Sequence, residues 1–139
     1  MNIYIDGIFD LFHSGHVEHF KKVKYLDGIN NNLIVGIISD KNAEGYKRKP
    51  IYDEKTRHCL IESCKYVNKI IEDAPLILTE EFLNINEIEL VCHAFADETD
   101  LDKQLEFFKV PIRMNKFRKV KYNQGISTTD IINKIKREY

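Results

Sequence analysis

The stretch Asn2-Ile3-Tyr4-Ile5-Asp6-Gly7-Ile8-Phe9-Asp10-Leu11-Phe12-His13-Ser14-Gly15-His16 lies near the start of the chain and indicates its fold. Its first four residues favour a strand, and the Asp-Gly pair that follows is typical of an abrupt strand end. Beyond the stretch, apolar side chains recur at every third position, at Val17, Phe20 and Val23. This period predicts a helix that begins at about His16.

The predicted start of this helix is suited to binding an anion. Unpaired backbone N–H groups at a helix N-terminus carry roughly half a positive charge. His13 and His16 would add two side-chain donors aimed at the same point, which suits phosphate chemistry. The same pair could ligate a metal, but the chain offers no third ligand at a matching spacing. We interpret His19, on the same helix, as an ordinary satisfied surface or core residue.

Composition limits the classes of function. The chain has 139 residues, which fits one domain, and we expect that domain to span residues 1–139. The net charge of −1 gives no overall field that favours nucleic acid or acidic membranes. The longest apolar run is too short to cross a bilayer. The cysteines have no paired spacing, which is typical of reduced thiols. We therefore expect a cytoplasmic protein with no nucleic-acid partner and no membrane segment.

The remaining sequence alternates between predicted strands and helices. We expect further strands at residues 33–38, 66–71, 89–92 and 110–112. We expect helices over residues 53–65, 80–83 and 99–108 and from Ser127 or Thr128 onward, with residues 40–50 as a polar loop. This order predicts an α/β fold in a single domain, with a doubly wound, Rossmann-like sheet of five parallel strands. In such folds ligands bind where the strand order reverses, which we expect at the first strand.

Two motifs resemble those of the HxGH nucleotidyltransferases. The opening stretch from Asp6 to His16 is similar to the first family signature, and Gly125-Ile126-Ser127-Thr128-Thr129-Asp130-Ile131-Ile132 is similar to the second. The likeness covers nearly the whole chain and is strongest to the catalytic domain of CTP-dependent choline-phosphate and ethanolamine-phosphate cytidylyltransferases. It implies transfer of CMP from CTP to a small phosphorylated alcohol or amino alcohol, with release of pyrophosphate. It also implies Mg²⁺ held mainly through the nucleotide phosphates, and a homodimer formed through Lys65–Lys69.

The resemblance assigns roles to individual residues. The expected catalytic residues are His13, His16 and Lys47. The expected nucleotide-binding residues are Gly7, Ile8, Phe9, Gly15, Lys121, Gly125, Ile126, Ser127, Thr128 and Thr129. The expected acceptor-binding residues are Asp6, Leu76, His93 and Glu98, and no protein ligand to a metal is expected. For Asp10, a turn-forming role and a direct role fit the sequence equally well.

The chain departs from the family pattern in its nucleotide half. Tyr122 and Asn123 stand where the family has an Arg-Thr pair, and Lys121 is the nearest residue that could supply the missing charge. Ala94-Phe95 replaces a pair of family aspartates, with Asp97 as a candidate substitute.

The acceptor half differs as well. Choline-binding members have aromatic residues at the positions of Leu76 and Glu98, and aromatic faces are what hold a quaternary ammonium. We therefore expect that choline phosphate is not the preferred acceptor. The alternative is that a phenylalanine from elsewhere rebuilds an aromatic cage, for which the candidates are Phe95, Phe107 and Phe108.

Two other functions stay open from the sequence. An HxGH enzyme could use a different nucleotide or acceptor, and a non-catalytic nucleotide-binding or interaction module would explain the departures at Tyr122 and Ala94. The intact histidines, Lys47 and the hydroxyls of Ser127–Thr129 favour an enzyme.

Overall fold

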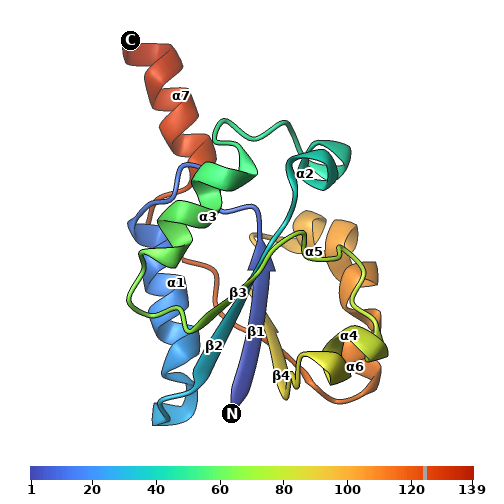
Figure 1. Cartoon of the computed structure of the whole chain (residues 1–139). Helices are drawn as coiled ribbons and strands as arrows, with labels where there is room; N and C mark the ends of the chain where they lie inside the picture. The colour runs from blue at the N-terminus through green and yellow to red at the C-terminus, as the bar shows by residue number, and fades with distance from the viewer. Residues whose placement is uncertain (124) are drawn as a thin grey trace.

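In residues 1–123 and 125–139, which the computed structural model describes, the chain forms a five-stranded parallel sheet (Figure 1). Its strands are β1 (Asn2–Gly7), β2 (Asn32–Ile37), β3 (Lys69–Ile71), β4 (Leu90–His93) and β5 (Phe117–Lys119). They lie in the order β3-β2-β1-β4-β5, and all four pairings are parallel. The doubly wound α/β fold is therefore confirmed, and the strand order reverses at β1 as the sequence predicts.

Helices cover both faces of this sheet (Figure 1). The helical segments are α1 (Ser14–Lys24), η1 (Leu26–Gly28), α2 (Asp40–Tyr46), α3 (Glu54–Glu62), α4 (Glu80–Ile85), α5 (Glu98–Gln104), η2 (Leu105–Phe108), α6 (Lys109–Arg113) and α7 (Thr128–Glu138). Within the part of the chain that the structure describes, none of them has the length and apolar character needed to cross a bilayer. Helix α7 projects away from the rest of the molecule and carries the C-terminus at its far end.

The alternation of side chains along β1 creates two cores. Ile3 and Ile5 point to one face, where they pack in a cluster with Phe20 of α1 and Ile61 of α3. Tyr4 points to the opposite face and joins a second cluster, which includes Leu83 of α4 and Phe108 of η2. Successive strand residues face opposite sides, so a strand that is apolar throughout can supply both cores.

The predicted strand at residues 110–112 is wrong. This segment forms helix α6, with Pro111 in its first turn, where the missing N–H costs no intrahelical hydrogen bond. The fifth strand instead lies at Phe117–Lys119 and pairs with β4. A short apolar run is equally compatible with a strand and a helical turn, and tertiary packing decides between them.

Two other boundaries also differ from the sequence prediction. The expected polar loop at residues 40–50 begins with helix α2, because the Ser39 hydroxyl accepts a hydrogen bond from Asn42 N–H at 3.2 Å and caps it. The expected strand at 66–71 begins only at Lys69. Asn68, just before it, accepts hydrogen bonds from Leu33 N–H at 2.8 Å and from Lys24 Nζ at 2.7 Å.

A buried arginine ties α3 to the carboxyl ends of the central strands. Arg57 is fully buried. Its guanidinium donates to the carbonyl oxygens of Ile8 and Ile38, each at 2.8 Å, to that of Tyr52 at 3.2 Å, and to the Asp40 carboxylate at 2.7 Å. The first two carbonyls lie just beyond β1 and β2, so this side chain holds together the loops at that edge of the sheet.

Replacing Arg57 with Met should lower the free energy of unfolding by about 3 kcal/mol or more, because the four acceptors lose their donor. Equilibrium unfolding in urea measures this loss. The matched control is Arg118→Gln, which breaks an exposed ion pair with Asp27 at 3.0 Å and should cost less than about 1 kcal/mol. Equal losses in the two variants would contradict the structural role of Arg57.

Candidate functional site

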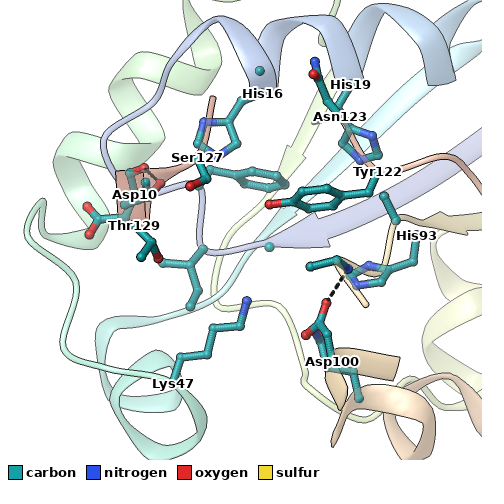
Figure 2. A pocket seen from close by; sticks show the side chains of 18 of the residues that line it. Asp10, His16, His19, Lys47, His93, Asp100, Tyr122, Asn123, Ser127 and Thr129 are labelled. Atoms are coloured by element: carbon teal, nitrogen blue, oxygen red, sulfur yellow. Dashed lines mark hydrogen bonds between the residues drawn. The ribbon is translucent and has the colours of Figure 1, made fainter. Parts of the chain in front are cut away.

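A cavity of about 780 Å³ opens at the carboxyl edge of the sheet. Its walls come from the turn after β1, the first turns of α1, the loop after α2, the end of β4, helix α5 and the segment that leads into α7 (Figure 2). These segments surround the point where the strand order reverses, which is where parallel α/β sheets bind ligands.

Most of the residues singled out from the sequence line this cavity. They are Asp6, Gly7, Ile8, Phe9, His13, Gly15, His16, Lys47, His93, Ile126, Ser127, Thr128 and Thr129. The chain segments that carry them are far apart in sequence, so the fold brings both signature motifs and Lys47 to one place.

Four of the expected residues lie outside the cavity lining in the part of the chain that the structure describes. Leu76 packs against a small buried cluster that contains Ala43. Glu98 is exposed in the first turn of α5. Lys121 and Gly125 are also exposed. The roles that the resemblance gives to these four residues stay predictions.

The two histidines form the N-terminal cap of α1. His13 is the N-cap residue, and its Nδ1 accepts a hydrogen bond from Gly15 N–H at 3.0 Å. The Nδ1 of His16 in turn accepts from His13 N–H at 3.1 Å. The two rings stack, with their centroids 3.8 Å apart. Because backbone donors occupy both Nδ1 atoms, the proton of each neutral ring lies on Nε2.

Burial keeps both rings neutral. Burial lowers the pKa of His13, and burial together with His13 and His19 lowers the pKa of His16 to about 3. The Nε2 atom of His13 is buried and has no hydrogen-bond partner within the described part of the chain. An unpaired buried donor is costly unless a ligand satisfies it. The geometry therefore presents a preformed N–H donor for an anionic or polar ligand.

The glycine between the histidines allows a close approach of two chain segments. A Cβ atom on Gly15 would lie 2.8 Å from the His13 ring and 3.0 Å from the backbone oxygen of Ile126. Such distances leave no room for a side chain. Glycine therefore lets the segment that enters α7 lie directly against the first turn of α1.

The start of α7 lines the same end of the cavity. The Ser127 hydroxyl caps this helix by accepting from Asp130 N–H at 3.1 Å. The Thr128 hydroxyl donates to the backbone oxygen of Asp10 at 2.8 Å. The N-terminal turns of α1 and α7 thus meet at one end of the cavity, and each contributes a partial positive charge there.

Asp10 has a structural role. Its buried carboxylate accepts hydrogen bonds from the N–H groups of Ile51 at 2.7 Å, Tyr52 at 2.9 Å and Leu11 at 3.0 Å. The sequence left a turn-forming role and a direct role open for Asp10, and these hydrogen bonds support the turn-forming role. They also join the loop after α2, which carries Lys47, to the turn that carries the histidines.

Acidic side chains line the side of the cavity toward which Lys47 points, and we call this side the acidic end. Burial raises the pKa of Asp6 to about 7, although Lys47 opposes the shift. Burial lowers the pKa of His93 to about 4, and its Nδ1 lies 3.8 Å from the Asp6 carboxylate. The Gln104 side chain donates to the carboxylate of Asp100. Figure 2 shows the Lys47 ammonium directed into the cavity, on the side where Asp100 and His93 lie.

Sequence reasoning missed several lining residues. They are His19, Tyr46, Arg48, Asp100, Lys103 and Gln104, together with Tyr122 and Asn123, which the family pattern marks only as departures. His19, which the sequence leads us to interpret as an ordinary residue, lies on a wall of the cavity. The sequence did contain a signal for the position of His19, because His16 and His19 lie three residues apart and therefore share a helix face.

The rebuilt aromatic cage is also absent among the described residues. Phe95, Phe107 and Phe108 pack in or against the second core instead of lining the cavity. Asp97 caps α5 by accepting from Asp100 N–H at 2.8 Å. Within residues 1–123 and 125–139, no group of three His, Cys, Asp or Glu side chains is placed to hold a metal ion.

The chain resembles known proteins in sequence and in structure. It is 37% identical over its whole length to "Choline-phosphate cytidylyltransferase 2" of Arabidopsis thaliana, of which it covers 46%. It is 29% identical over 97% of its length to "Ethanolamine-phosphate cytidylyltransferase" of Dictyostelium discoideum, of which it covers 36%. The chain thus spans less than half the length of these relatives.

A solved structure shares the fold. The lipopolysaccharide core biosynthesis protein from Thermoplasma volcanium superposes with a TM-score of 0.65 at 22% identity, over 89% of this chain and 98% of that one. The family model described as cytidylyltransferase-like matches residues 4–134, which include both signature motifs and every wall of the cavity. The chain therefore belongs to the cytidylyltransferase-like family.

Proposed function

We propose that this chain transfers CMP from CTP to a small phosphorylated alcohol or amino alcohol and releases pyrophosphate. The observation that carries the proposal is the pair of neutral histidines at the start of α1, held against the start of α7 in one cavity. The relatives named for cytidylyltransfer to choline phosphate and ethanolamine phosphate support the same reaction class.

The reaction needs positioning and charge stabilisation. An oxygen of the acceptor phosphate attacks the α-phosphorus of CTP, and the bond from that phosphorus to the β-bridging oxygen breaks, so that pyrophosphate leaves with the electron pair. A phosphate monoester is anionic near neutral pH, so the attack requires no general base. The Nε2–H groups of His13 and His16 donate to the α-phosphate oxygens as charge develops there.

The β- and γ-phosphates are assigned to the basic groups of the cavity and to the start of α7. Lys47 and Arg48 line the cavity, and the N-terminal turn of α7 adds backbone N–H groups and the Thr129 hydroxyl. Mg²⁺ would be held mainly by phosphate oxygens and water, since the described residues provide no cluster of ligands and backbone donors occupy the Asp10 carboxylate. When bound, the cation would neutralise charge on the triphosphate.

The acidic end of the cavity is assigned to the head group of the acceptor. Above pH 7 the Asp6 carboxylate is charged, and with Asp100 it suits an ammonium or hydroxyl group that can donate hydrogen bonds. A trimethylammonium has no such donors and needs aromatic faces. We therefore assign an acceptor with N–H or O–H groups in preference to choline phosphate.

Incubation of the protein with CTP, Mg²⁺ and ethanolamine phosphate should release pyrophosphate, and His13→Asn should reduce kcat by about 100-fold or more. Asparagine preserves the helix cap but removes the Nε2 donor, so the melting temperature should stay nearly unchanged. Coupled detection of pyrophosphate and thermal unfolding measure the two effects.

The control for this variant is Ser14→Ala, an exposed neighbour on α1 that does not line the cavity. It should retain wild-type activity. A fully active His13→Asn protein would refute the role of the histidine pair, and CTP binding without pyrophosphate release by the wild type would favour a non-catalytic module.

Ethanolamine phosphate and glycerol phosphate should each give a higher kcat/KM than choline phosphate at pH 8, where Asp6 is charged. Asp6→Asn should lower kcat/KM for ethanolamine phosphate by about 10-fold, because it removes a charged hydrogen-bond partner of the ammonium. It should affect glycerol phosphate, which has no cation, much less. The assignment of the acceptor end fails if choline phosphate is the best substrate.

We also propose that the protein is a cytoplasmic homodimer. A groove of about 460 Å³ between α1 and the end of α3 is lined mainly by apolar side chains, and it includes Lys65 and Tyr66 of the stretch that resembles the family interface. The three cysteines are free thiols, which suits a reducing compartment.

Light scattering at micromolar concentration should give about twice the monomer mass of 16.4 kDa, and Tyr66→Glu should give the monomer mass. A monomeric wild-type protein contradicts the proposal.

A further inference from the structure

His19 occupies a wall of the cavity that the proposed chemistry has not used. It lies one helical turn beyond His16 on the same face of α1 and lines the cavity together with Tyr122 and Asn123. Figure 2 shows the three side chains grouped on one side of the cavity, beyond His16 and away from Lys47.

Two contacts place these side chains opposite one another. At one end the Lys22 ammonium donates to the backbone oxygen of Lys121 at 3.4 Å. At the other end the backbone oxygen of Ile126 lies within 3.0 Å of the Cβ position of Gly15. Between Gly15 and Lys22 the helix rises about 10 Å, at about 1.5 Å per residue. Tyr122 comes directly after Lys121 in the chain, and it therefore lies opposite the part of α1 that carries His19.

The chemistry of this wall differs from that of the charged side chains of the cavity. Burial and the neighbouring Lys22 lower the pKa of His19 to about 4, so its ring is neutral at physiological pH. Burial raises the pKa of Tyr122, so its phenol is also neutral. A neutral imidazole offers a flat face, one donor and one acceptor, and a phenol offers a second ring and a hydroxyl. Such groups suit a planar, uncharged ligand.

The reacting molecules contain only one group of that kind. Phosphates favour the cationic side chains of Lys47 and Arg48, and an amino-alcohol head group favours the carboxylates of Asp6 and Asp100. Cytosine is planar and uncharged, and it carries both hydrogen-bond donors and acceptors. Base–aromatic stacking and hydrogen bonds are the usual means of holding such a ring.

We propose that His19 and Tyr122 bind the pyrimidine base of the nucleotide, with His19 as a substrate-binding residue. The inference rests on the proposed use of CTP and adds the part of the site that recognises its base. His19 touches the base and takes no part in the transfer of the phosphoryl group.

The test compares CTP with inorganic tripolyphosphate, which has the phosphates but no base, by titration calorimetry with Mg²⁺. His19→Ala should weaken CTP binding by about 10-fold, as the loss of one base-stacking ring does, and leave tripolyphosphate binding unchanged. His19→Phe keeps a flat ring and should recover most of the CTP affinity. Glu18→Ala, an exposed change on the same helix, should alter neither ligand.

Each other result overturns the inference. CTP affinity within twofold of wild type in His19→Ala would show that the base lies elsewhere. Equal weakening of CTP and tripolyphosphate would assign His19 to the phosphates or to the fold. A higher KM for the acceptor alone would assign this wall to the acceptor. A wild-type protein that binds tripolyphosphate but no CTP would refute the proposed function as well, and that outcome is distinct from the first three.

Discussion

The arrangement of the cavity depends on the hydrogen bonds made by Asp10. Its carboxylate accepts from Ile51 and Tyr52, and its backbone oxygen accepts from the Thr128 hydroxyl. One residue therefore joins the histidine turn, the loop that follows Lys47 and the start of α7. A buried carboxylate that lost its donors would bear a large desolvation cost, so the histidine turn and the loop after Lys47 are held in register by the need to satisfy it. The start of α7 is joined to them separately, through the backbone oxygen of Asp10.

Burial determines the protonation of the groups around the cavity. It lowers the pKa of the histidines and raises that of Asp6 to about 7. The histidines are consequently neutral, and positive charge in the cavity comes from Lys47, Arg48, Lys103 and the helix N-termini. Lys47 lies close enough to the acidic groups to oppose the rise in the pKa of Asp6. Groups of both signs therefore line the same cavity, while its histidines carry no charge.

The backbone at the histidine turn is strained to achieve this geometry. Phe9 and Leu11 both have positive φ, at 55° and 48°. Non-glycine residues adopt this region only when the surrounding structure compensates. Here the Phe9 ring packs edge-on against His16 and Phe20, with centroid distances of 5.6 and 5.1 Å. The core contact stabilises the turn, and the turn places the His13 and His16 rings where they stack.

The sequence by itself determined the fold class and the two motifs that carry most of the candidate site residues. Periodicity is local, so the apolar β2 and the histidine-bearing start of α1 could be recognised without knowledge of their neighbours. It failed at Val110–Ile112, where a short apolar run fits a strand and a helical turn equally well. Only the tertiary structure decided that His19 and Tyr122 line one cavity and that Asp10 joins separate segments, because these placements depend on contacts between residues as far apart as Asp10 and Thr128. No local pattern encodes such a contact, and packing in three dimensions is what makes it.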